Sequence, residues 1–184
     1  MNDPRYKYDK VNAIKIILVS SDNRILLIKE PDTNEWMPGH WGLPGGKALV
    51  KESLYGAFNR KSQGDLGVNL EPLGIFRIEE LLMEGRTVMM FHIVTKMDEI
   101  FKPKGEIAGY KWVGVGDLEE MDLTDFTEFF NRQLLLDYLK GDKELASLDL
   151  VNTFDYYKMS NDNDYKRWQD SGKKYDKQNR ESHK

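Results

Sequence analysis

The apolar residues of this chain fall into short runs that predict β-strands separated by turn-forming residues. The predicted strands cover residues 11–19, 25–29, 73–80, 87–97 and 107–113. Residues 20–23 form a polar turn, so we expect the first two strands to pair in an antiparallel manner. The third and fourth strands are joined around Glu84 and Gly85, and a loop from residue 30 to 40 follows the second strand.

Two further stretches have the spacing of amphipathic helices. From about residue 51 to 66, Leu54, Ala57 and Phe58 recur on one side of a helix, and Gly67 suits the left-handed residue that ends it. In the second stretch, which stops at Gly141, the apolar residues at helical spacing are Phe126, Phe129, Phe130, Leu134, Leu135 and Tyr138. Such a stripe is typical of core packing, so we assign it no ligand role.

A glycine-rich turn precedes the first predicted helix. Gly45 and Gly46 can adopt positive φ and let backbone atoms approach a ligand closely. Along the helix, Lys61, Gly64 and Asp65 are three and four residues apart, so they project from one face. That face carries one cation, one position without a side chain and one carboxylate. Its charge is therefore near zero, which is compatible with one tightly held cation and not with several.

Together, the turn and the helix resemble a Nudix box. The positions in register with the family pattern are Gly46, Glu52, Arg60, Gly67 and Val68. Lys61, Ser62 and Gly64 stand where the family has Glu, an aliphatic residue and Glu, and Asp65 replaces the last Glu. The resemblance implies an α/β fold, the Nudix α/β/α sandwich with a mixed sheet between helices. In the usual member, three carboxylates on this face hold two or three cations that bridge a pyrophosphate.

The departures from the pattern are similar to those of one branch, the GDP-mannose mannosyl hydrolases. Residues 60–65 match that branch position by position, and the similarity extends from residue 39 to 112. Enzymes of the branch bind one magnesium ion and attack the sugar carbon, releasing nucleoside diphosphate and sugar. The resemblance thus implies hydrolysis of a nucleotide sugar with one Mg²⁺, for which Mn²⁺ is an alternative. A leaving diphosphate needs its charge neutralised, and no ion is required to activate water at phosphorus.

The same resemblance assigns the metal ligands and raises the question of the general base. It implies that the magnesium is held by the Gly46 carbonyl, Asp65 and Glu106. The base of the branch is a His next to a metal-binding Gln, and Ile107, which cannot accept a proton, stands at the His position. His40 is the substitute histidine in the loop that enters the box.

Other residues complete the candidate site. Glu99 and Glu106 are carboxylate candidates for the base, and His92, in an apolar strand, is expected to be structural. Arg60 is a candidate catalytic residue whose role in the family is to pair with an acidic side chain, here Glu52 or Asp65. The candidates for substrate binding, each with a solvated or packed alternative, are Lys29, Lys61, Arg77, Arg86 and Trp36.

Composition limits the other classes of function. The 184 residues suit one domain, for which we expect an arm at 1–10, a Nudix domain at 11–142 and an extension at 143–184 that is flexible from about 160. With no cysteine, disulfides and thiol nucleophiles are excluded, and a reducing cytoplasm is expected. The net charge of −4 gives no general attraction for nucleic acid. The apolar runs are too short to span a membrane, and the first residues do not resemble a secretory signal. A homodimer is compatible with the sequence.

Two classes of function remain open. The first is a magnesium-dependent hydrolase of a nucleoside diphosphate derivative, most simply a nucleotide sugar. The second is a Nudix-fold module that binds a nucleotide or a protein and has lost turnover, which the missing carboxylates and Ile107 favour. We favour the enzyme because Asp65 and Glu106 remain at the two side-chain positions of a one-metal site. A pyrophosphatase that attacks phosphorus is a further alternative.

Overall fold

A computed structural model of the chain describes residues 9–34, 37–83, 86–97, 107–141, 143–148 and 151. The chain divides into two units, Met1–Val151 and Asn152–Lys184, and the described fold belongs to the first. Its centre is a mixed sheet with strand order β3-β2-β1-β6-β5, in which β4 pairs with β1 and β7 pairs with β2. No described helix has the length and apolar character needed to cross a bilayer.

All five predicted strands are present. The strands are β1 (Asp9–Ser20), β2 (Ile25–Lys29), β3 (Trp41–Gly42), β4 (Gly45–Lys47), β5 (Gly74–Met83), β6 (Arg86–Met97) and β7 (Gly109–Val113). The helices are α1 (Leu54–Lys61), a π-helical turn η2 (Ser62–Leu66), α2 (Val115–Glu120), a short 3₁₀ turn η3 (Leu123–Asp125) and α3 (Asn131–Lys140). Strands β3 and β4 were not predicted, because two or three residues are too few to show a period. The short α2 and η3 were also not predicted.

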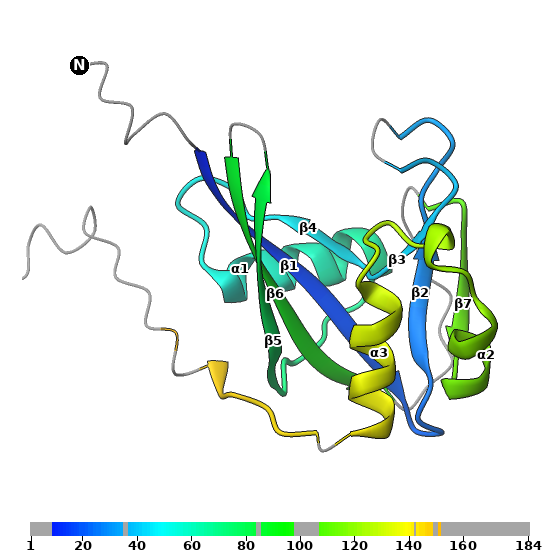
Figure 1. The fold of residues 1–184 in the computed structure, drawn as a ribbon. Helices are drawn as coiled ribbons and strands as arrows, with labels where there is room; N and C mark the ends of the chain where they lie inside the picture. Colours follow the sequence, from blue (N-terminus) through cyan, green and yellow to red (C-terminus); the bar gives the residue numbers. More distant parts are fainter. Residues whose placement is uncertain are drawn as a thin grey trace, which may run out of the picture. The chain divides into compact units, whose positions relative to one another are not determined.

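Strand β1 is the centre of the sheet and is buried on both faces. It pairs in parallel with β6 over its whole length and antiparallel with β2 and β4. Ile14, Ile16 and Leu18 pack in one core with residues of α1. Ile17 and Val19 pack in a second core with residues of α3. Figure 1 shows α1 behind the sheet and α3 in front of it, which confirms the predicted α/β/α sandwich.

Helix α1 begins later than predicted and ends in an unusual turn. It starts at Leu54 and not near residue 51, because Lys51 has a left-handed φ of 64° and the Ser53 hydroxyl caps the helix by accepting a 3.0 Å bond from the Gly56 N–H. The next five residues form the π-helical η2. Gly67, with φ of 74°, ends the run as predicted.

Helix α3 is shorter than the apolar stripe that predicted it. The helix begins at Asn131, so the residues from 126 to 130 form a separate segment in front of it. Leu134, Leu135 and Tyr138 lie in the core as predicted. Phe129 is 77% exposed, so its assignment to the core was wrong. The helical period fails there because the chain is not helical at that point.

The backbone of the glycine turn lies so close to β1 that a side chain cannot fit. Gly45 has a φ of +146°, and a Cβ at this position would lie 2.1 Å from the Ile14 carbonyl oxygen. Gly64 provides the contrast, because a Cβ there would meet no atom within 4 Å.

We therefore predict that Gly45→Ala lowers the free energy of unfolding by about 3 kcal/mol, since backbone must move to admit the methyl group. The matched control, Gly64→Ala, should change stability by less than about 1 kcal/mol, towards a more stable fold. Urea unfolding followed by circular dichroism measures both. Similar losses in the two variants would contradict the close approach of Gly45 to β1.

Candidate functional site

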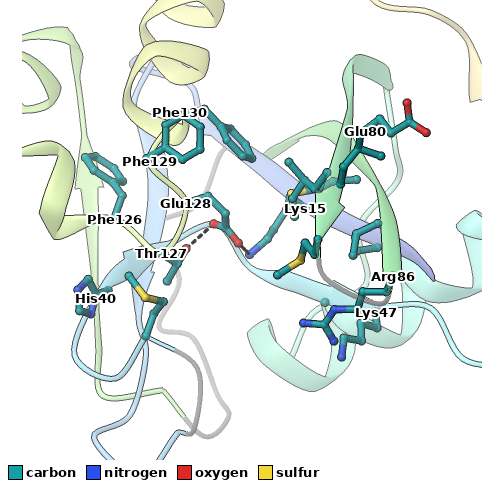
Figure 2. Close-up of a pocket in the computed structure, with 18 of the residues that line it drawn as sticks. Lys15, His40, Lys47, Glu80, Arg86, Phe126, Thr127, Glu128, Phe129 and Phe130 are labelled. Carbon is teal, nitrogen blue, oxygen red and sulfur yellow. Dashed lines mark hydrogen bonds and ion pairs between the residues drawn. The ribbon is translucent and has the colours of Figure 1, made fainter. Parts of the chain in front are cut away.

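A pocket of about 1110 Å³ opens on the α3 side of the sheet and reaches the glycine turn. Strands β1 and β6 contribute Ala13, Lys15, Val88 and Met90, and β4 contributes Gly46 and Lys47. Figure 2 shows further side chains from the end of β5, from the loop before β3 and from the segment before α3. The apolar side chains from these regions include Met37, Leu82, Met83, Leu123, Phe126, Phe129 and Phe130. The pocket is therefore mainly apolar, with charged groups at a few places.

Arg60 joins the loop before α1 to the helix itself. Its Nε and Nη2 donate to the two carboxylate oxygens of Glu52, each at 2.8 Å, and Nη2 also donates to the Lys47 carbonyl at 3.0 Å. The Leu49 N–H donates to Glu52 at 2.7 Å. The hydrogen bonds from Arg60 hold the pKa of Glu52 below its usual range, and the same bonds raise the pKa of Arg60. Of the two partners considered for Arg60, the structure places Glu52 against it.

Lys61 and Asp65 lie on one face of the helix, one turn apart. The Lys61 ammonium is 3.3 Å from Asp65 Oδ1, while Asp65 Oδ2 accepts a 3.2 Å bond from the Gly45 N–H. The ammonium also rests against Gly46, because a Cβ at that glycine would lie 3.2 Å from Lys61 Nζ. A positive charge thus already lies beside two of the three predicted metal ligands.

This arrangement bears on whether the site suits a magnesium ion. The Lys61 ammonium acts as a stand-in cation, which shows that Asp65 accommodates one positive group beside Gly46. Magnesium is commonly bound through one or two carboxylates, with waters and substrate phosphates as its other ligands. Across the described residues, no three His, Asp or Glu side chains gather closely enough to hold a metal. Asp65 is the one predicted side-chain ligand that the structure describes, and an ion bound there would compete with Lys61 for its carboxylate. Glu106 lies outside the described residues.

His40 is the one candidate base that the structure describes, because Glu99 and Glu106 lie outside the described residues. It lines the pocket, and its Nδ1 is 2.7 Å from the Pro38 carbonyl oxygen. A carbonyl can only accept, so Nδ1 carries the proton in the neutral ring. Nε2 then has a free lone pair, which is the form that a general base requires.

The candidates for substrate binding separate into two groups. Arg86 lines the pocket. Arg77 instead donates from Nη1 to Asp137 on α3 at 3.0 Å, and Lys29 lies with its ammonium 5.8 Å from the centre of the Trp41 ring. Neither Arg77 nor Lys29 lines this pocket. Trp36 lies outside the described residues.

Two charged residues of the pocket were not identified from the sequence. Lys15 Nζ lies 2.9 Å from Glu128 Oε1, and each side chain is only 11% exposed. Glu128 Oε2 also accepts bonds from the Thr127 hydroxyl and, at 2.7 Å, from Asn131 Nδ2. Burial acts to raise the pKa of Glu128, but the charge of Lys15 and these hydrogen bonds outweigh it and lower the pKa. A signal was present, since Lys15 is the one charged residue in the apolar run 11–19.

His92 matches the structural role expected of it. The side chain is fully buried in β6, and its ring lies edge-on to Phe130, with 6.2 Å between ring centres. Burial lowers the pKa of His92 to about 4, so the ring is neutral at physiological pH.

Comparisons with known proteins agree with this fold. A MutT protein from Methanosarcina mazei Go1 superposes with a TM-score of 0.64 at 19% identity, over 75% of this chain and 99% of that chain. A NUDIX hydrolase from Nitrosomonas europaea superposes with a TM-score of 0.64 at 17% identity, over 79% of this chain and 98% of that chain. A search of curated protein sequences found no match. The NUDIX domain profile matches residues 9–137, which is more than half of the chain, so the chain belongs to the NUDIX domain family.

Proposed function

We propose that this Nudix hydrolase cleaves a nucleotide sugar of the GDP-mannose type by attack at the sugar carbon, with a single magnesium ion. The observation that carries the proposal is the Lys61 ammonium 3.3 Å from Asp65 on the helix face that usually holds several cations. The pair leaves this face close to neutral.

Electrostatics limits the number of ions on this face. Two unit charges 4 Å apart repel by about 4 kcal/mol at an effective dielectric constant near 20, and a divalent ion doubles the effect. A second ion beside Lys61 would meet that repulsion with no further carboxylate on the face, since Gly64 has no side chain. One ion on Asp65 and the Gly46 carbonyl, completed by Glu106 and by phosphate oxygens, is the set that remains.

Attack at the sugar carbon suits a site with one ion. The magnesium ion, when bound, neutralises the charge that develops on the departing diphosphate. Lys47 and Arg86 line the pocket and form no ion pair with any carboxylate that the structure describes, so both are available to bind phosphate. His40 accepts a proton from the attacking water at Nε2, and its bond to the Pro38 carbonyl holds the ring in place.

The rest of the pocket suits the nucleoside. Aromatic side chains from the segment before α3 line it, and Phe129 presents 77% of its surface to solvent. An exposed aromatic ring beside a binding pocket provides a flat apolar face for a nucleobase. The sugar and diphosphate are then directed towards Gly46 and Lys47, which also line the pocket.

A second candidate is a nucleotide-binding module without turnover. The Lys61–Asp65 ion pair favours it as well, because the ammonium competes with a metal for the described carboxylate of the site. Both candidates bind a nucleotide, but only the hydrolase converts it to product, so product analysis distinguishes them.

We predict that Lys61→Glu strengthens binding of Mg²⁺ or Mn²⁺ by about 10-fold or more, because it replaces a repelling charge with an oxygen ligand. Isothermal titration of the full chain measures the change. The matched control is Lys96→Glu, which makes the same charge change at an exposed position on β6. A gain of the same size in the control, or no gain at Lys61, would mean that this side chain does not act on the metal site.

The bond that breaks is tested with ¹⁸O-labelled water. Hydrolysis of a nucleotide sugar should place the label in the free sugar, detected by mass spectrometry, with unlabelled nucleoside diphosphate as the other product. Label in nucleoside monophosphate or in sugar phosphate would show attack at phosphorus and would contradict the proposal. Nucleotide binding without any product would favour the binding module.

A further inference from the structure

The Lys15–Glu128 ion pair is a charged feature within a mainly apolar pocket. Lys15 comes from the central strand β1, and Glu128 comes from the segment before α3 (Figure 2). Both side chains are almost fully removed from water. Taking two charges out of water is costly, and well-packed apolar residues often stabilise a fold at least as well as a buried ion pair. Stability alone therefore gives little reason for this pair.

The two partners differ in their unused hydrogen-bonding capacity. The Glu128 carboxylate accepts from Lys15, Thr127 and Asn131. The Lys15 ammonium has three N–H groups, and its one hydrogen-bond partner among the described residues is Glu128. Two donors therefore remain inside a pocket that is otherwise poor in acceptors. A ligand that brings an acceptor to this point gains a charge-assisted hydrogen bond.

The charge of the pair indicates which acceptor fits. A phosphate group bound to Lys15 would also lie close to the Glu128 carboxylate, because the two side chains are only 2.9 Å apart. A carbonyl oxygen carries no net charge and avoids that repulsion. Lys47 and Arg86, which have no described carboxylate partner, are better placed to take the phosphates.

We propose that Lys15 selects nucleobases that carry a carbonyl group at their buried edge over those that carry an amino group there. An amino group at the same point would set N–H against N–H and leave the ammonium donors unpaired. Glu128 is a positioning residue in this scheme, because it holds the ammonium in place. The inference rests on the proposed function only in that the ligand is a nucleotide, and it does not depend on which bond is cleaved.

Two pairs of nucleotides test this contact. Inosine and adenosine diphosphate differ in a 6-oxo group with a neighbouring N1–H against a 6-amino group with an N1 lone pair. Uridine and cytidine diphosphate differ in the same way at positions 4 and 3, so the loss of the ratio in a Lys15 variant assigns the contact. Isothermal titration of the full chain with each nucleotide should show the oxo member of a pair binding about 10-fold more tightly or better, as expected for a lost hydrogen bond to a charged group. Equal affinities within both pairs would overturn the proposal.

The double variant Lys15→Met/Glu128→Gln tests the assignment to Lys15 without leaving a buried carboxylate unpaired. Its oxo-to-amino affinity ratio should fall to within about threefold, since the charge-assisted bond is absent. The control Lys47→Met should weaken both members of a pair alike and keep the ratio. Retention of the full ratio in a folded double variant, checked by thermal unfolding, would overturn the role of Lys15. If the double variant does not fold, the oxo-to-amino affinity ratio of the unmodified chain tests the proposal, and a ratio of one in both pairs overturns it.

The outcome also separates this inference from the proposed function. An oxo preference that the double variant loses, with no hydrolysis of any nucleotide sugar, would support the inference and contradict the proposed function. Hydrolysis of nucleotide sugars with no base preference would support the proposed function and contradict the inference. Failure to bind any of the four nucleotides would contradict the inference, whereas the proposed function is judged by the hydrolysis of nucleotide sugars.

Discussion

The close approach of the Gly45 backbone to β1 is the constraint on which the site depends. The turn can lie there only because Gly45 has no side chain, since a Cβ at this residue would lie 2.1 Å from the Ile14 carbonyl oxygen. Strand β4 then pairs with β1, so that Gly45 lies opposite Lys15. The Gly45 N–H donates to Asp65, and Lys61 rests against Gly46. The turn therefore links the charged helix face to the strand that provides the charge inside the pocket.

The proposed function depends on a change of charge on the α1–η2 helix face, while the backbone around it is held in place. The Glu52–Arg60 pair still fixes the loop to the helix, so the box keeps its shape. What differs is Lys61, whose ammonium neutralises Asp65 where the usual family member adds a second carboxylate. A site of this kind is suited to stabilising one leaving group and poorly suited to assembling several ions around a phosphorus atom. Family membership thus fixes the fold, and under the proposed function the charge of one helix face selects the bond that is cleaved.

The elements with a clear hydrophobic period were predictable from sequence. Strand β2 was predicted with its observed ends, and Arg60 was expected to pair with Glu52 or Asp65. The late start of α1 was missed because the left-handed conformation at residue 51 is adopted by a lysine, and no glycine or proline there indicates it. Phe129 was misplaced because a helical period was extended across a segment that is not helical.

The polar centre of the pocket was harder to predict for a different reason. Lys15 and Glu128 are far apart in the chain, and only the packing of the segment before α3 against β1 brings them within 2.9 Å. A single charge in a buried strand indicates that a partner exists, but it does not indicate where the partner lies. Tertiary contacts of this kind have no local period from which they could be inferred.

The account rests most directly on the claim that the box of this chain holds one cation. Counting bound Mn²⁺ by electron paramagnetic resonance, in the full chain with saturating nucleoside diphosphate, tests that claim. We expect one tightly bound ion per chain, because the helix face offers a single carboxylate beside an ammonium. Two or more tightly bound ions per chain, or none, would contradict the account.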